Sequence, residues 1–414
     1  MQILASTPLC VTTLLWEGAP GEWTLTVAVK VTLSIEHERE AFLSDVQVDA
    51  TGDRTHGEVP GASLRETNDV APFKPRVDVM LVGHAYAPGG VPVSELVATL
   101  RVGELEKSLR VFGDRDPRAP PGAAPVPFSL MPIRYERGAR SAAIPLGVDG
   151  ARAMPNLVPL VAGHAPSFGP LSPEWPCRRE LLDAAGQRWA RALHPRTPRA
   201  PSAPPGIEHA FFNAAPFEQR LALLRPGTTV ELVNLHPTHE RFVTQIPALR
   251  PRVYQKDPAQ PRPRELPLRC DTLWIDADDG LATLTFRGLV GVATGDERDL
   301  PALLVVLQSP ERPPPLVQVE ALLRAQGDAA EGLVATHPLA VRHDAVKSSE
   351  PLGEVPAQAP PSSPLRASEP ANVPLAEPVD VPEPSPRGPS REPWRDGALA
   401  AHGGRSADLL GSQS

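Results

Sequence analysis

Proline constrains what this chain can fold into more than any other residue type. Of the 414 residues, 53 are proline, which is about 13%, against about 5% in an average protein. Long helices are largely excluded, because a proline inside a helix removes a backbone donor and costs about 3 kcal/mol. Since 41% of the residues are hydrophobic, the chain can still bury a sizeable core. These two properties together favour a fold built mainly from strands.

Alternating apolar residues predict the first strands. Between Leu25 and Ile35 every second residue is apolar, a pattern typical of a strand with one face toward solvent. The segments 96–102 and 105–112 also alternate, on either side of Gly103-Glu104. This arrangement predicts a β-hairpin.

Later segments are predicted from their flanking residues and their length. A further hairpin is predicted for 272–275 and 282–286, because the intervening Asp279-Gly280 supplies the positive φ angles that a primed turn requires. The continuous apolar run 303–307 predicts a buried strand. Helical patterning is scarce, and short helices are predicted only for 179–191 and 316–325.

Composition divides the chain into three parts. Residues 1–310 are predicted to form a mainly β domain, with antiparallel hairpins packed as a sandwich or partly open barrel, and the proline-rich stretch 195–206 is predicted to be a loop. A short helical extension follows at 311–345. Between 351 and 393, 13 of 43 residues are proline. Such a segment buries too little apolar surface to offset its ordering entropy, so 346–414 is predicted to be a disordered tail.

Charge and cysteine usage limit the partners and the compartment. The formal net charge is −8, which excludes the broad basic field that non-specific binding of nucleic acids or anionic membranes needs. Cys10, Cys177 and Cys270 form no CxxC or Cys/His pair, and this is typical of a reducing compartment. The start of the chain, 1–16, resembles no export signal, and no run of about 20 apolar residues occurs. We therefore expect a cytoplasmic protein.

No pattern indicates a cofactor, a metal or a catalytic residue. The glycine-bearing stretch 82–90 has neither a P-loop ending nor the GxGxxG spacing. Asp276, Asp278 and Asp279 do not follow the EF-hand register, so a turn explains them better than calcium does. His236 and His239 lie in a proline-containing turn, and no GxSxG motif is present. The interpretation is that the chain binds another protein and has no enzymatic activity.

A series of motifs carries a resemblance to a known family. They are FKPRVDVMLVGHAYAPGGVPVSELVATLRVGELEKSLRVFGDR (73–115), RYER (134–137), MPNL (154–157), SFGPLSPEW (167–175), FFNAAPFEQ (211–219), ELVNLHP (231–237) and CDTLWID (270–276). In these motifs the chain resembles domain-of-unknown-function family 2169, over about residues 1–310. The resemblance implies an effector adaptor of bacterial type VI secretion, which binds a toxin in the cytoplasm and helps to load it onto the secretion spike.

The resemblance also supplies the candidate partner-binding residues. We expect recognition in three loop regions, 82–90, 155–175 and 211–219. The candidates are Gly83, His84, Tyr86, Gly89, Gly90, Gly113, Asp114, Arg115, Tyr135, Glu136, Arg137, Pro155, Asn156, Phe168, Gly169, Pro170, Trp175, Phe212, Asn213, Pro216 and Gln219. The expected partners are a protein effector and, as a second partner, a spike-tip protein, with no nucleic acid and no membrane. For the aromatic residues among them, packing in a β core is at least as good an explanation.

Two alternatives stay open from the sequence. The first is a hydrolase with dispersed acidic catalytic residues, which would need two carboxylates about 5–10 Å apart in a cleft. The second is a structural component of the secretion spike or baseplate, which would need a large apolar oligomer face.

Overall fold

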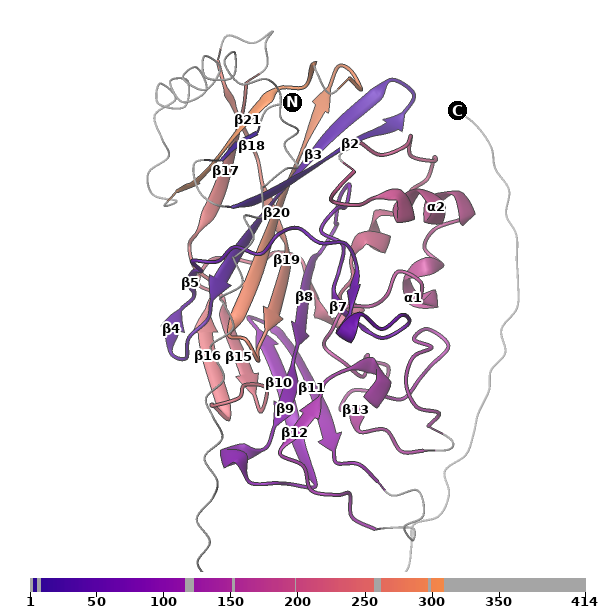
Figure 1. Ribbon diagram of the computed structural model, residues 1–414, viewed down its shortest axis with the longest axis vertical. Helices are drawn as coiled ribbons and strands as arrows, with labels where there is room; N and C mark the ends of the chain where they lie inside the picture. Colours follow the sequence, from indigo (N-terminus) through magenta and orange to yellow (C-terminus); the bar gives the residue numbers. More distant parts are fainter. Residues whose placement is uncertain are drawn as a thin grey trace, which may run out of the picture. The chain divides into compact units, whose positions relative to one another are not determined.

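The computed structural model describes residues 3–5, 9–115, 123–150, 153–197, 199–256, 262–296 and 299–308, all of which lie in the compact unit Met1–Asp344. The predicted helical extension at 311–345, including the helix at 316–325, and the predicted tail at 346–414 lie outside these residues. The described part is mainly β, as predicted, and consists of several packed sheets (Figure 1). Among its helices, none is long and apolar enough to cross a bilayer.

Two large sheets and one small sheet form the framework. The largest sheet has seven strands: β2 (Cys10–Ala19), β3 (Glu22–Ser34), β5 (Phe42–Leu43), β8 (Val77–Val82), β14 (Arg220–Leu221), β19 (Arg269–Asp276) and β20 (Leu281–Val292). The six-stranded sheet consists of β4 (Arg39–Glu40), β10 (Glu95–Val102), β11 (Leu105–Phe112), β13 (Leu157–Pro159), β15 (Thr229–Val233) and β16 (Arg241–Gln245). The four-stranded sheet consists of β1 (Ile3–Ala5), β17 (Arg250–Lys256), β18 (Arg264–Leu266) and β21 (Ala302–Gln308).

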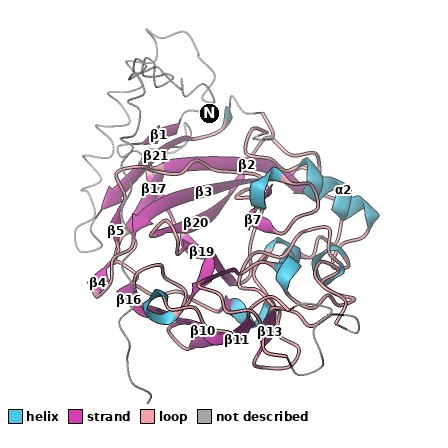
Figure 2. Ribbon diagram, turned by 60° about the horizontal axis from the view of Figure 1, so that its bottom comes forward, coloured by secondary structure: helices cyan, strands magenta, loops and turns pink. Residues whose placement is uncertain are grey.

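Short elements complete the described chain. Two strand pairs lie apart from the larger sheets: β9 (His84–Tyr86) with β12 (Leu130–Pro132), and β6 (Arg54–Thr55) with β7 (Leu64–Glu66). The α-helices are α1 (Pro176–Arg179) and α2 (Ala184–Ala192), and the 3₁₀-helices are η1 (His56–Glu58), η2 (Pro88–Gly90), η3 (Tyr135–Arg137), η4 (His209–Phe212) and η5 (Phe217–Gln219). Figure 2 shows the helix α2 at one side of the seven-stranded sheet and β10, β11 and β13 below it.

One hydrophobic core joins the three larger sheets. Val29 of β3, Leu100 of β10 and Val305 of β21 are all fully buried and belong to the same cluster of packed side chains. Because each sheet contributes one apolar face to this cluster, the sheets pack on one another as layers. The predicted buried strand at 303–307 is confirmed as part of β21.

The strand β3 differs from its prediction on one face. Thr26, Lys30 and Thr32, which were expected to face solvent, are 1%, 8% and 0% exposed. The segment 44–72, which contains β6, η1 and β7, covers them. The Thr26 hydroxyl donates to the carbonyl of Pro72 (2.9 Å), and the Lys30 ammonium contacts the Asp69 carboxylate (2.9 Å). The prediction that one face of β3 is exposed to solvent was wrong. Alternation shows which residues of a strand are apolar, but it does not show which segment covers the polar ones.

Both predicted hairpins are confirmed, and the second has a different turn. Strands β10 and β11 pair antiparallel from Val102–Leu105 outward, and β19 pairs with β20 from Asp276–Leu281 outward. The β19–β20 connection has four residues, 277–280, and of these only Gly280 has a positive φ (64°). The prediction of a primed two-residue turn was therefore wrong for this hairpin. A type I′ turn needs a positive φ at both central residues, and a type II′ turn needs one at the first.

The region 176–206 supports one edge of the seven-stranded sheet. The helix predicted for 179–191 is in fact split into α1 and α2, because the Asp183 side chain caps a new helix start by accepting from the amide of Gly186 (2.7 Å). The proline-rich loop that follows runs along β2, where the amides of Ala200 and Ala203 donate to Leu15 and Glu17 (both 2.9 Å). The loop thus covers an otherwise open sheet edge.

Candidate functional site

Residues 83–86 (GHAY) and the β19–β20 turn (277–280) meet at the end of the seven-stranded sheet. The Asp278 carboxylate accepts from the amide of His84 (3.2 Å) and the hydroxyl of Tyr86 (2.8 Å), and it lies 2.6 Å from Nδ1 of His84. Although burial opposes its charge, the bonds from His84 and Tyr86 hold the pKa of Asp278 below its ordinary value. Gly83 has a φ of 132°, and a Cβ there would lie 2.7 Å from Oδ1 of Asp278. These contacts hold two distant motifs together.

Three further motifs meet at Asp114. The guanidinium of Arg137 donates to the Asp114 carboxylate (2.7 Å), and the side-chain amide of Asn156 donates to the same oxygen (3.1 Å). Asn156 also exchanges backbone and side-chain bonds with Phe112. Arg115, the neighbour of Asp114, lies over the Phe112 ring at 5.0 Å. The residues of GDR, RYER and MPNL thus form one polar cluster beside the end of β11.

The RYER motif also joins the SFGPLSPEW segment. The Tyr135 hydroxyl donates to the carbonyl of Gly169 (2.9 Å), and its ring packs edge-to-face on Trp175 with centroids 4.8 Å apart. Glu136 faces the other way and accepts from both the amide and the hydroxyl of Ser63 (both 2.7 Å). η3 therefore connects the β6–β7 region with α1.

The FFNAAPFEQ segment supplies two buried polar side chains to the core. Asn213 donates to the Asp78 carboxylate (2.9 Å), which also accepts from Lys74 (3.0 Å) and from the amides of Ala214 (2.9 Å) and Ala215 (3.2 Å). Gln219 accepts from the buried ammonium of Lys107 (2.7 Å) and donates to the carbonyls of Val79 and Phe168. Both residues are 0% exposed. They join β8 to the loops around it.

Burial separates the predicted site residues into groups. Ten are buried: Gly113, Tyr135, Phe168, Gly169, Pro170, Trp175, Phe212, Asn213, Pro216 and Gln219. Eight are half-buried: Gly83, His84, Tyr86, Arg115, Glu136, Arg137, Pro155 and Asn156. Only Gly89, Gly90 and Asp114 are exposed. The buried group builds the framework, so partner contact by the predicted residues remains a prediction for the other two groups.

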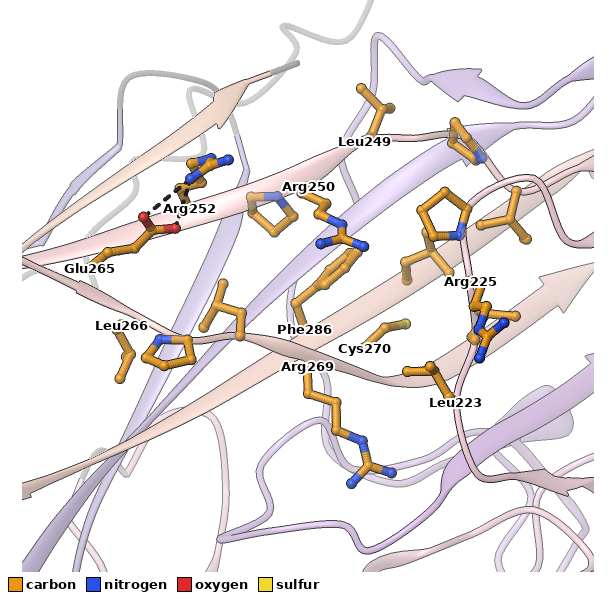
Figure 3. Close-up of a pocket in the computed structure, with 18 residues that line it drawn as sticks. Leu223, Arg225, Leu249, Arg250, Arg252, Glu265, Leu266, Arg269, Cys270 and Phe286 are labelled. Atoms are coloured by element: carbon orange, nitrogen blue, oxygen red, sulfur yellow. Dashed lines mark hydrogen bonds and ion pairs between the residues drawn. The ribbon is translucent and has the colours of Figure 1, made fainter. Parts of the chain in front are cut away.

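A cavity lies elsewhere, between the four-stranded and seven-stranded sheets. It has a volume of 490 Å³, and Figure 3 shows its lining. The walls come from the segments 223–226, 246–252 and 265–270, and from Leu284 and Phe286 of β20. We call this cavity the arginine-rimmed groove, because Arg225, Arg250, Arg252 and Arg269 line it among leucines and prolines.

Positive charge dominates the groove. Its acidic lining residue, Glu265, pairs with Arg252 at 3.0 Å. Arg269 donates to the carbonyls of Pro75 (2.9 Å) and Ala222 (3.2 Å). The exposed side chains of Arg225 and Arg250 have neither a hydrogen bond nor an ion pair with any described residue. These two guanidinium groups are therefore available to acidic groups from outside.

Gly288 and Cys270 shape the floor of the groove. A Cβ at Gly288 would lie 2.7 Å from the carbonyl oxygen of Pro267, so glycine lets the segment 266–268 cross close over β20. Burial raises the pKa of the Cys270 thiol to about 12. The thiol is thus protonated and is a poor nucleophile. The floor is suited to packing against apolar side chains.

The groove was missed by reasoning from the sequence. Of its lining, only Cys270 belongs to a motif that was singled out. The sequence feature that could have indicated the groove is the alternation of arginine with proline and leucine in 247–252 and 261–269. In the described residues, no group of three or more His, Cys, Asp or Glu side chains could hold a metal ion.

His56 makes stability depend on pH in the acidic range. It is 9% exposed, and burial together with the charges of Arg134 and Arg65 lowers its pKa to about 4. In an unfolded chain the pKa is about 6.5. Between pH 6.5 and 4 the unfolded chain binds a proton that the folded chain does not bind, so the free energy of unfolding falls as the pH falls. We expect this slope to be smaller in His56→Gln, measured by urea denaturation across that range.

The exposed His194 provides the matched control. In His194→Gln the slope should equal that of the unchanged protein. A slope in His56→Gln that also equals it would contradict the role of His56.

Comparison with known proteins gives one match. The sequence model of a family described as "Uncharacterized protein conserved in bacteria (DUF2169)" matches residues 20–287. The matched segment contains every motif described above and the walls of the arginine-rimmed groove. No curated protein and no solved structure matches the chain.

Proposed function

Because this chain belongs to the DUF2169 family of uncharacterised bacterial proteins, we propose that it is a non-enzymatic adaptor that binds a type VI secretion effector in the cytoplasm and helps to load it onto the secretion spike. The resemblance of the motifs to this family supports the adaptor role. A second line of support comes from the arginine-rimmed groove, which has the chemistry of a peptide-binding surface.

The groove is the structural observation that carries the proposal. Leu249, Leu266 and Phe286 contribute apolar surface to the lining of the groove. The exposed side chains of Arg225 and Arg250, which also line it, form no ion pair with a described residue. Apolar anchors surrounded by arginine are typical of protein interfaces, because burial of apolar surface supplies affinity and charge-assisted hydrogen bonds orient the partner. The fitting partner is an effector segment that carries leucine-like and acidic side chains.

Such binding explains what an adaptor does for its effector. An effector segment with exposed apolar side chains tends to aggregate until it reaches the secretion machine. Covering that segment stabilises the soluble effector by mass action. Release then requires only that contacts with the spike replace those with the groove.

The proposal predicts a toxin gene next to the gene of this protein, and the test is co-expression with the product of that gene. We expect the double variant Arg225→Glu/Arg250→Glu to bind the effector at least about tenfold more weakly, because two favourable charges become repulsive. The measurement is the dissociation constant of the purified pair, together with the soluble yield of the effector.

Arg110→Glu is the matched control, since Arg110 is an exposed arginine on β11 outside the groove. It should leave the affinity within about twofold, as expected for an exposed substitution outside the contact. If the effector remains soluble and is secreted in cells that lack this protein, the adaptor function is refuted. If the effector binds but both variants bind equally well, the groove is not the binding surface.

A further inference from the structure

A second cavity lies between the helices α1 and α2 and the segments 52–53 and 67–70. It has a volume of 210 Å³ and shares no lining residue with the arginine-rimmed groove. Arg178 of α1 lines it, opposite Ala190 and Arg191 of α2, and Phe211 and Phe212 close it on the apolar side. We call it the Arg178 cavity.

Arg178 is held in place by neutral groups. The side chain is part of a residue only 4% exposed. Its Nε donates to the carbonyl of Phe211 (3.0 Å) and its Nη1 to the carbonyl of Leu171 (2.6 Å), while the Phe211 ring lies 5.0 Å away. A guanidinium has five N–H donors and remains charged in proteins. These contacts therefore fix the fork of Arg178 without neutralising it.

The other buried cations of the described residues all have a carboxylate partner. Their ion pairs are Lys30–Asp69 (2.9 Å), Lys74–Asp78 (3.0 Å), Lys107–Glu218 (2.8 Å) and Arg287–Asp271 (2.6 Å). Arg178 has no carboxylate within 4 Å among the described residues. Burying a charge is costly unless it is paired. Arg178 is thus the exception among the buried cations of the described residues.

The acidic residues of the cavity form no ion pair with Arg178 within 4 Å among the described residues. Glu174 is engaged by Arg191 through two bonds (2.7 and 2.9 Å). Asp53 accepts from the amide of Asn68 (2.8 Å), and its charge favours the cationic form of Arg178 without direct contact, whereas burial lowers the pKa of Arg178. Arg179 adds a further positive charge to the lining. The cavity therefore carries more positive than negative charge, with a fixed guanidinium at its wall.

We infer that the Arg178 cavity binds a carboxylate. The planar fork of an arginine matches the two oxygens of a carboxylate, and the pairing is stronger where water is excluded. The carboxylate belongs to a polypeptide C-terminus, to an acidic side chain or to a free organic acid, and these sources share the chemistry that Arg178 recognises. This inference is independent of the adaptor proposal, because it concerns another cavity and needs no effector.

The test uses four small probes and the full-length protein. N-acetylalanine represents a C-terminus, N-acetylglutamic acid α-amide an acidic side chain, acetate a free acid, and N-acetylalanine amide is the uncharged control. We expect at least one carboxylate to bind at least about tenfold more tightly than the amide, measured by ligand-observed NMR titration. The strongest of the three probes identifies the source.

Two variants of Ala190 link that binding to the cavity. Ala190→Glu places a carboxylate on the cavity wall, where it should compete for Arg178, abolish probe binding and raise the melting temperature. Ala190→Gln has the same size and nearly the same helix propensity, and it should weaken binding much less. Equal binding of amide and carboxylate, no binding of any probe, or equal effects of the two variants would overturn the inference.

Discussion

Replacing Asp78 by alanine (Asp78→Ala) should lower the free energy of unfolding by about 3–5 kcal/mol, as is typical when one partner of a buried ion pair is removed. Asp78 is fully buried and accepts four hydrogen bonds, from Lys74, Asn213, Ala214 and Ala215. Its removal leaves the 2% exposed Lys74 with a hydrogen bond to a threonine hydroxyl and no carboxylate. The large cost therefore comes from an uncompensated cation in the core.

The pH dependence of the same variant provides a second measurement. Although burial opposes the charge, Lys74 and the amide of Ala214 hold the pKa of Asp78 below its ordinary value. In an unfolded chain the pKa of an aspartate is about 3.9. The stability that Asp78 contributes is thus present above that value and is lost as the pH falls below it. Asp78→Ala should lack this part of the acid-induced loss.

Denaturant unfolding of Asp78→Ala beside Asp45→Ala checks the expectation. Asp45 is exposed, so its replacement should change the free energy of unfolding by no more than about 0.5 kcal/mol. A loss below about 1 kcal/mol in Asp78→Ala would mean that the polar network around β8 does not hold the loops to the sheet.

Gly113→Ala should cost about 2–4 kcal/mol, at the upper end of what overpacking costs. Gly113 follows β11, and a Cβ there would overlap the carbonyl oxygen of Val126 and lie 3.3 Å from the Phe128 ring. Since the nearest atom belongs to the backbone, a side-chain rotation cannot relieve the overlap. The neighbouring Asp114 cluster would shift with it.

Gly291 is the matched control for this substitution. It lies in β20, and a Cβ there would meet no atom within 4 Å. Gly291→Ala should therefore be neutral or slightly stabilising, because alanine loses less chain entropy on folding. Thermal unfolding of both variants makes the comparison. Equal melting temperatures would show that the chain around Val126 adapts without cost.

The fold could be predicted from the sequence where the information is local. Alternation located β3, β10 and β11, and the short apolar run located β21. The prediction that one face of β3 is exposed to solvent was wrong, because the alternation in β3 carries no information about the segment 44–72 that covers this face. The single helix expected at 179–191 failed for a local reason, the capping by Asp183.

The sites depended on contacts between distant segments, and those could not be predicted. Asp278 and His84 are 194 residues apart in the chain, and the walls of the arginine-rimmed groove come from four separate stretches. The motifs correctly indicated residues that meet one another. Many of them meet inside the molecule, where they hold the layers together, and this is why their positions alone did not locate the groove.

The loop along β2 has a consequence for how copies of this chain coexist in a cell. The amides of Ala200 and Ala203 donate to the carbonyls of Leu15 and Glu17. A β-strand of another molecule therefore cannot pair with β2 at these two carbonyls. Copies of this chain are thus protected from pairing edge to edge at these positions, which is the first step toward fibrils. Recognition of any partner at this edge would then depend on side chains and not on backbone pairing, which any sequence can supply.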